Sequence, residues 1–215
     1  MKNKKTNNEN NTNISNKTLS RNKKLALTGA LSALDVVLVI TNLGFIPISP
    51  VASPTILHIP VILAVMLAGL PEGLFVGGVF GVASLIKAAM SPAGVLDPLF
   101  VNPLCSVLPR LLIAVIAWAV WKLLNLIPHM SKILSSAITA LITTVSHTLL
   151  VIGSLFLIQG KNLPAETLDA GFWVAITANS FNIILECVAA VIISVAVYTG
   201  IHIASNKKSK LSSEK

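Results

Sequence analysis

ILHIPVILAVMLAGLPEG, residues 56–73, is the stretch that separates the possible fold classes of this chain. It contains His58 near its start, and Pro71 and Glu72 close it, so the apolar run between them covers only residues 59–70. A helix that crosses a lipid bilayer needs about 20 apolar residues. The run therefore belongs either to the core of a water-soluble protein or to a short helix inside a membrane protein.

Composition decides in favour of a membrane protein. The 215 residues are 54% hydrophobic and 11% charged, with a mean hydropathy of +0.82, whereas soluble domains carry roughly 25% charged residues. Lysine and arginine outnumber the acids by 16 to 8, but seven of these bases lie in residues 1–24 and four in 207–215, so they form no face for nucleic acid. Cys105 and Cys187 are isolated in apolar runs, which indicates neither a disulfide framework nor a metal site. No cofactor is expected.

Six apolar segments predict an all-α membrane protein with six transmembrane helices in a compact bundle. The segments are 25–43, 56–70, 72–90, 103–123, 133–158 and 171–204. Six spans place both termini on one side, and the basic ends, together with Lys122 and Lys132, mark that side as cytoplasmic. We expect one membrane domain over residues 24–204, a disordered Asn-rich tail over 1–23 and a basic tail over 205–215.

Signature motifs of common enzymes are missing from the sequence. There is no G-x-x-x-x-G-K-[ST] to hold nucleotide phosphates, no H-E-x-x-H of a metalloprotease and no G-x-S-x-G of a serine hydrolase. We therefore expect a protein that is not an enzyme. If it transports a substrate actively, another protein must hydrolyse the ATP.

Ionisable and amide side chains in or beside the spans are the candidate functional residues. Such groups are costly in lipid and usually line a cavity or meet a partner. Counted at about 1.5 Å per residue from the nearest loop, they fall in the outer half of the bilayer, which favours an outward-opening pocket over a channel. The candidates are His58, Lys87, Asn102, Arg110, His147, Asn182 and Glu186. Mutual neutralisation as buried ion pairs is the alternative, and Asp35 has no assigned role.

Two of the predicted helices carry small residues at helical spacing. Small residues on one face let helices approach closely in lipid. The stripes are Gly73, Gly77 and Gly81 in the third segment, and Ala26, Gly29, Ala30 and Ala33 in the first. We interpret the glycines as internal packing. For the first segment, internal packing and docking to another membrane protein are both open.

Four stretches of the sequence resemble one transporter family. HIPVILAVMLAGLPEGLFVGGVFGVASLIKA, SPAGVLDPLFVNPLCSVLPRLLIAVIA, SHTLLVIGSLFL and NIILECVAAVI are similar to the substrate-binding S components of energy-coupling-factor (ECF) vitamin transporters, and the likeness covers nearly all of residues 24–204. The resemblance implies a multi-pass protein of a prokaryotic plasma membrane with a vitamin pocket near the extracellular face. It implies a transmembrane coupling protein and two cytoplasmic ATPases as partners, and it favours docking through Ala26 and Ala30.

The vitamin is suggested by the pattern LFVNPLCSVLPRLL together with N-x-x-x-E in the last segment, which looks most like the pantothenate-type branch. Pantothenate is a small anion, so Arg110 or Lys87 would hold its carboxylate, and Asn102, Asn182 and His147 suit its hydroxyls and amide. The scarcity of aromatic residues argues against a large flat ligand.

Two positions depart from the pattern of that branch. His147 stands where asparagine is expected, and Leu57 precedes the histidine where glycine is common. Riboflavin, folate, thiamine and biotin therefore stay open as ligands. A self-sufficient secondary transporter and a purely structural membrane protein are the remaining alternatives.

Overall fold

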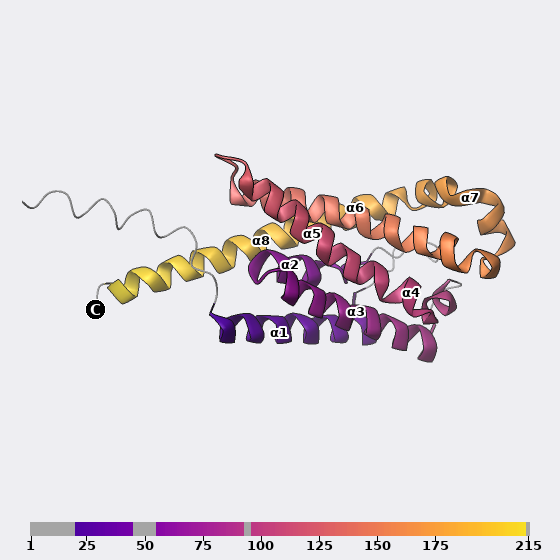
Figure 1. Cartoon of the computed structure of the whole chain (residues 1–215), viewed down its shortest axis with the longest axis horizontal. Coiled ribbons are helices and arrows are strands. Elements are labelled where there is room, and N and C mark those ends of the chain that lie inside the picture. The colour runs from indigo at the N-terminus through magenta and orange to yellow at the C-terminus, as the bar shows by residue number, and fades with distance from the viewer. Residues whose placement is uncertain (1–19, 45–54, 93–95, 214–215) are drawn as a thin grey trace, which may run out of the picture.

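The computed structural model describes residues 20–44, 55–92 and 96–213. Within these ranges the chain is built of helices joined by turns and short loops (Figure 1). In chain order they are α1 (Arg21–Ile40), α2 (Ile59–Leu67), α3 (Leu70–Met90), η1 (Asp97–Val101), α4 (Pro103–Ser106), α5 (Leu108–Leu126), α6 (Lys132–Gln159), η2 (Gly160–Asn162), α7 (Ala165–Ala178) and α8 (Ser180–Ser213).

The short stretch of residues 56–73 forms the centre of the bundle. α2 packs against α1, α3, α5, α6 and α8, and every residue from Ile59 to Met66 is buried. Its nine residues make a helix of about 14 Å, less than half of the roughly 30 Å hydrocarbon core. Gly69, with a φ of 121° that favours glycine, then turns the chain into α3. The stretch is a core helix that neighbouring helices shield from lipid.

Within the described ranges, four helical segments have the length and apolar composition needed to cross a membrane: Leu70–Met90, Pro103–Leu126, Lys132–Asn162 and Ser180–Ile201. α1 and α2 are not among them. The helical fold of a membrane protein is therefore confirmed, whereas the number of six spans stays a prediction. The start of α1 and the end of α8 lie at the same end of the bundle (Figure 1), and the side of the membrane that this end faces is also a prediction.

The predicted sixth segment is two helices in the structure. α7 contains a non-helical residue, Gly171, with φ 80° and ψ 165°. The chain breaks again at Asn179, whose side-chain amide donates to the carbonyl oxygen of Ala175 at 3.1 Å. α8 then runs to Ser213, past the boundary at residue 204 expected from hydropathy. Hydropathy joined the helices on either side of Asn179 because the few polar residues there are outnumbered by the apolar residues before and after them.

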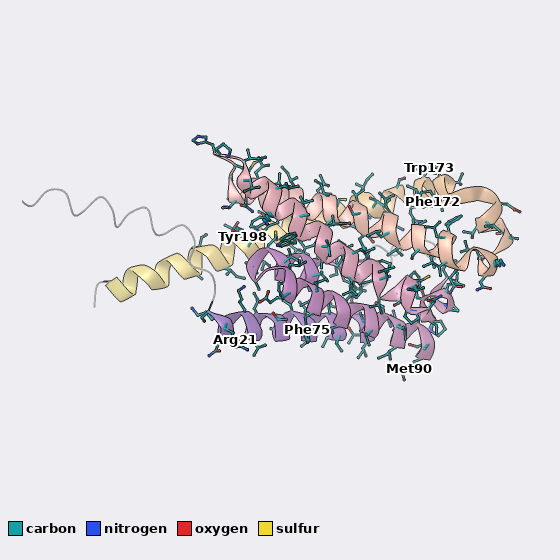
Figure 2. All side chains as sticks on the ribbon, viewed as in Figure 1. Arg21, Phe75, Met90, Phe172, Trp173 and Tyr198 are labelled. Carbon is teal, nitrogen blue, oxygen red and sulfur yellow. The ribbon has the colours of Figure 1, made fainter. Side chains whose placement is uncertain are left out.

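α1 and α3 run side by side along one edge of the bundle (Figure 1). Lys24 of α1 donates to the carbonyl oxygen of Ala68 and forms an ion pair of 3.6 Å with Glu72, which fixes the first turns of the two helices next to each other. Figure 2 shows Arg21 at this end of the bundle and Phe172 near the opposite end. α5 packs between α3 and α6, and α6 packs along α8.

The glycine stripe of α3 is internal packing, as the sequence predicted. An added Cβ would lie 2.2 Å from Val65 Cγ2 at Gly73 and 2.6 Å from the carbonyl oxygen of Arg110 at Gly77. At Gly81 it would lie 2.7 Å from the Cα of Val107. α2 and the start of α5 therefore approach α3 more closely than any larger residue allows.

Candidate ligand-binding site

Two histidines stack in the interior where α2 meets α6. His58, at the N-terminus of α2, is fully buried, and its ring lies 5.0 Å from the ring of His147 with an interplanar angle of 25°. His58 Nε2 is 2.9 Å from the hydroxyl of Thr144, which itself donates to the carbonyl oxygen of Ala140 at 2.8 Å. The Thr144 hydroxyl proton is already donated to Ala140, so His58 Nε2–H donates to the Thr144 oxygen. Nδ1 of the neutral ring is then an acceptor.

Arg110 brings a positive charge to the same cluster from α5. One guanidinium nitrogen, Nη1, donates to the carbonyl oxygen of Cys105 at 2.9 Å. The guanidinium carbon lies 5.3 Å from the ring centroids of both Phe80 and Phe100. Phe80 is also 6.2 Å from the His147 ring, so it links the cation to the histidine pair. Aromatic faces and a carbonyl oxygen stabilise this buried charge in place of a carboxylate.

The buried charges do not neutralise one another within the described ranges. Arg110, Asp35 and Glu186 form no ion pair with any residue described there. Asp35 is fully buried, and neither of its carboxylate oxygens has a hydrogen-bond partner among the described residues. The interpretation of the polar residues as buried ion pairs therefore finds no support in the part of the chain that the structure describes.

Several buried polar atoms of the candidate residues have no partner among the described residues. These atoms are Nδ1 of His58, both ring nitrogens of His147, Nε of Arg110 and Oδ1 of Asn182. Buried polar groups in proteins almost always have hydrogen-bond partners. Together they offer a cationic donor, histidine groups that can donate or accept, and an amide acceptor. Such a set suits a ligand with a negative charge and several hydroxyl or amide groups.

The two α8 candidates differ in how far the protein already occupies them. Asn182 donates to Oδ1 of Asn179 at 3.2 Å and keeps its own oxygen unpartnered. Glu186 Oε1 accepts from the backbone N–H of Thr55 at 2.7 Å and from its hydroxyl at 3.2 Å. Oε2 accepts from the hydroxyl of Thr148 at 3.4 Å. The Glu186 carboxylate is thus engaged by the protein itself.

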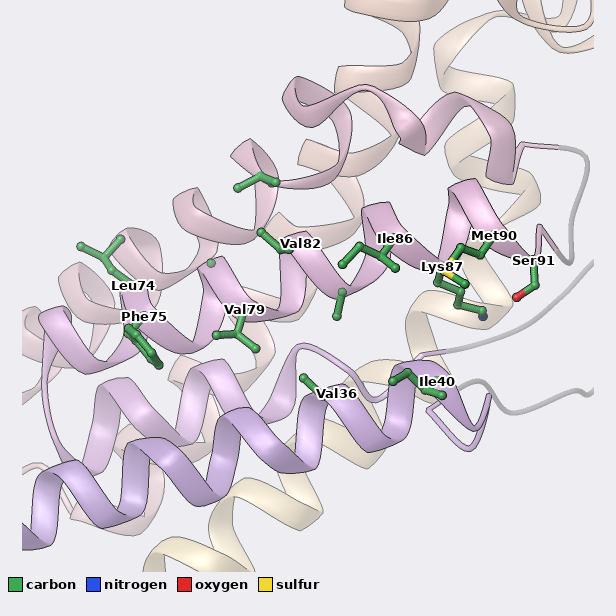
Figure 3. A pocket seen from close by; sticks show the side chains of 13 residues that line it. Val36, Ile40, Leu74, Phe75, Val79, Val82, Ile86, Lys87, Met90 and Ser91 are labelled. Carbon is green, nitrogen blue, oxygen red and sulfur yellow. The ribbon is translucent and has the colours of Figure 1, made fainter.

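Lys87 lies on the side of α3 that faces α1, where it borders an apolar groove between the two helices (Figure 3). Val36 and Ile40 of α1 form one wall, and α3 residues such as Val82 form the other. The groove contains none of the other predicted site residues. Asp97 of η1 interacts with Lys87 electrostatically. Lys87 thus borders a surface that lacks the histidines and Arg110.

Asn102 has a structural function in the chain before α4. Its side-chain oxygen accepts a hydrogen bond from the backbone N–H of Leu104 at 3.0 Å, and it is the N-cap of the helix. Asparagine is among the preferred N-cap residues because its oxygen satisfies a free N–H of the first turn. The structure therefore brings His58, Arg110 and His147 together and gives Asn102 a different environment.

Sequence reasoning missed the hydroxyl partners of the site. Thr144 and Thr148 flank His147 on α6 and bond to His58 and Glu186 respectively. Their spacing of about one helical turn is a signal that could have been read, since residues three or four apart share a helix face. Phe80 left no such signal, because an apolar residue among apolar residues does not stand out.

The small residues of α1 lie on the face directed away from the bundle. Ala26, Gly29, Ala30 and Ala33 are all exposed, and a Cβ added at Gly29 would meet no atom within 4 Å. The opposite face of the helix is polar and buried, and it carries Thr28, Ser32 and Asp35. The α1 stripe therefore does not serve packing within the described part of the chain.

Comparison with known proteins gives the family. The sequence profile of the ECF transporter, substrate-specific component, matches residues 23–199. The chain belongs to this family. The resemblance seen in the sequence is thereby confirmed, and the chain is a membrane-transporter component that binds substrate.

Two curated relatives have the same kind of name. The chain is 31% identical over 191 residues to "Pantothenate transporter PanT" of Leuconostoc mesenteroides subsp. mesenteroides, an alignment that covers 83% of this chain and 91% of that protein. It is 28% identical over 167 residues to "Pantothenic acid transporter PanT" of Lactococcus lactis subsp. cremoris, covering 71% and 80%. As a member of the ECF family, the chain shares most of its length with both.

Proposed function

We propose that this protein captures pantothenate at a pocket open to the outside of a prokaryotic cell and delivers it across the plasma membrane. Both relatives are named as pantothenate transporters. The observation that carries the proposal is a cluster of the buried Arg110 and His147. In the described part of the chain, Nε of Arg110 and both ring nitrogens of His147 have no hydrogen-bond partner. Pantothenate matches this set because it is an anion with hydroxyls and an amide.

Arg110 is the residue that meets the carboxylate of the vitamin. Its Nη1 donates to the Cys105 carbonyl oxygen, and its guanidinium lies against two phenylalanine rings. The guanidinium group is therefore oriented before the ligand binds. A buried cation without a carboxylate nearby gains strongly from an anionic ligand, since charge-assisted hydrogen bonds are about twice as strong as neutral ones. Lys87 instead borders the apolar groove, whose lining includes neither Phe80 nor Phe100.

The hydroxyl and amide groups of the vitamin meet His58, His147 and Asn182. His58 Nδ1 and Asn182 Oδ1 are acceptors, and the neutral imidazole of His147 supplies one donor and one acceptor. A site that hydrogen-bonds every polar group of its ligand rejects analogues that lack one of them, because a buried group is then left unpaired. This requirement gives the pocket its selectivity.

Uptake requires partners, because the sequence holds no motif for ATP hydrolysis. A transmembrane coupling protein and two cytoplasmic ATPases supply the energy, with both termini of this chain on the cytoplasmic side. The exposed stripe of α1 docks against the coupling protein, since small residues let a partner helix approach closely in lipid. Its position on the outer face of the bundle supports this role.

The experiment is a calorimetric titration of the purified full-length protein with pantothenate. We expect tight binding by the wild type and a loss of at least 30-fold in Arg110→Gln, because removing one partner of a buried charged pair costs about 2–5 kcal/mol. Lys87→Gln, the matched control, should change the affinity less than threefold. Loss of binding in Lys87→Gln with retention in Arg110→Gln contradicts the assignment of the carboxylate.

Further ligands separate the remaining possibilities. If the protein binds riboflavin, folate, thiamine or biotin and not pantothenate, it is an S component for that vitamin. Uptake into vesicles should require the coupling protein and the ATPases. Proton-driven uptake by this protein alone would instead make it a self-sufficient transporter.

A further inference from the structure

Glu186 is hydrogen-bonded to the chain next to both stacked histidines. Thr55, which donates to Oε1 through its backbone N–H at 2.7 Å and its hydroxyl at 3.2 Å, stands three residues before His58. Thr148, which donates to Oε2 at 3.4 Å, follows His147 directly in α6. One carboxylate on α8 therefore joins the segment that leads into α2 to the turn of α6 that carries the second histidine.

We propose that Glu186 is a positioning residue that holds His58 in register with His147. This inference rests on the proposed function only for its effect on affinity, since the link between the two segments is a property of the protein itself. Glu186 is 8% exposed, and each of its oxygens already accepts a bond from the protein. The carboxylate acts on the ligand through the two histidines.

The segment at residues 55–58 needs such a tether because it lies ahead of α2, outside the helices. On one side, the N–H of Ile56 donates to the carbonyl oxygen of Gly44, at the end of the α1 region, at 3.0 Å. On the other side the N–H of Thr55 has only Glu186 as its acceptor among the described residues. Thr55 is half-buried, and an N–H partly shielded from water loses stabilisation when its acceptor is removed. The segment is therefore expected to shift if the carboxylate is removed.

The stacking of the histidines depends on this register. His58 and His147 come from different helices, and their rings meet at 5.0 Å. The Thr144 hydroxyl holds only Nε2 of the His58 ring, and Glu186 fixes the backbone three residues earlier. Displacement of that backbone moves the Nδ1 acceptor of His58 away from the unpartnered nitrogens of His147. A ligand then finds the same groups in a different geometry.

The test combines hydrogen–deuterium exchange with pantothenate titration on the full-length protein in lipid nanodiscs. Glu186→Gln is isosteric, but it removes the negative charge and one of the two acceptor oxygens, so the bonds from Thr55 and Thr148 lose their charge assistance. In the absence of ligand we expect amide exchange in peptides covering residues 55–58 to rise at least tenfold in this variant. Glu166→Gln is the matched control, because Glu166 is exposed in the first turn of α7, and it should leave the exchange unchanged.

The affinity for pantothenate should fall by at least tenfold in Glu186→Gln and stay within twofold of the wild type in Glu166→Gln. Faster exchange together with weaker binding supports the positioning role. Unchanged exchange overturns it, and weaker binding with unchanged exchange identifies Glu186 as a direct ligand contact instead. Faster exchange with unchanged affinity also overturns it.

The proposed function can fail separately from this inference. If the wild type binds no pantothenate while Glu186→Gln still accelerates exchange at residues 55–58, the link between the segments stands and the identity of the ligand is wrong. If Glu186→Gln does not fold, Thr148→Val removes one of the three bonds and leaves the other two. It should then raise exchange in the same peptides by a smaller factor, and no rise overturns the proposal.

Discussion

α1 and α3 lie side by side and carry the same sequence pattern, yet they use it in opposite ways. In α3 the small residues face inward, and a Cβ at Gly77 would lie 2.6 Å from the carbonyl oxygen of Arg110. In α1 they face outward, and a Cβ at Gly29 would meet no atom within 4 Å. A stripe of small residues therefore permits close packing, but it does not indicate whether the packing partner belongs to the same chain.

The residues opposite each stripe explain the difference. Behind the α1 stripe the helix carries Thr28, Ser32 and Asp35, and polar groups cannot face lipid at low cost. These residues are buried, which leaves the small residues outside. Behind the α3 stripe lie apolar residues such as Phe75 and Val82, which are exposed and suited to lipid. Whether the opposite face is polar or apolar therefore decides which side of the helix enters the bundle.

The largest effect is expected from Gly77→Ala. The new methyl group would collide with the backbone of α5 at Arg110, and backbone cannot move aside as a side-chain end can. Overpacking of this kind costs about 1–3 kcal/mol of unfolding free energy, and the displacement of Arg110 should weaken pantothenate binding as well. Thermal unfolding of the purified protein measures the first effect and titration the second.

Gly78→Ala is the matched control for this prediction. It adds the same methyl group one position along α3, where the nearest atom, Cδ2 of Leu111, is 3.8 Å away, an ordinary contact. We expect the control to be as stable as the wild type. Equal stability of the two variants would mean that the close approach of α3 and α5 does not contribute to folding.

An intermediate effect is expected from Ala30→Leu on the α1 stripe. Because Ala30 is exposed among the described residues, the larger side chain has room there, and stability should change by less than about 0.5 kcal/mol. Pantothenate binding should stay within twofold, whereas uptake into vesicles with the coupling protein and ATPases should fall at least tenfold. Ala165→Leu, an exposed alanine in α7, should leave uptake unchanged. Full uptake by Ala30→Leu would remove the stripe from the docking surface.

The smallest effect is expected from Gly29→Ala. There is open space at this position, and alanine favours a helix over glycine by up to about 1 kcal/mol. The unfolding free energy should therefore be unchanged or slightly higher, opposite in sign to the effect at Gly77. A clear loss of stability in thermal unfolding would show that α1 packs against a part of the chain outside the described ranges.

Hydropathy and motifs predicted the long helices and the family, because both depend on local sequence. The sequence offered His58, Arg110 and His147 only as separate candidates, because the contacts among them join different helices. Counting residues along a helix predicts how far Lys87 and Arg110 lie from the membrane surface. It does not predict the direction that each side chain takes around the helix axis. Lys87 therefore turned out to border an apolar groove on the α1 side of α3. The bonds from Glu186 to Thr55 join residues 131 positions apart, and no periodicity in the sequence reports such a pairing.

The nine residues of α2 also constrain how the protein is made. A translocon releases a segment into lipid when that segment is long and apolar enough to span alone, and α2 is too short for this. It has to enter together with α3, as a hairpin joined at Gly69. Of its other neighbours, α1 is synthesised before it, and α5, α6 and α8 are synthesised afterwards. Biogenesis therefore produces the centre of the bundle early and encloses it only when the last helix arrives.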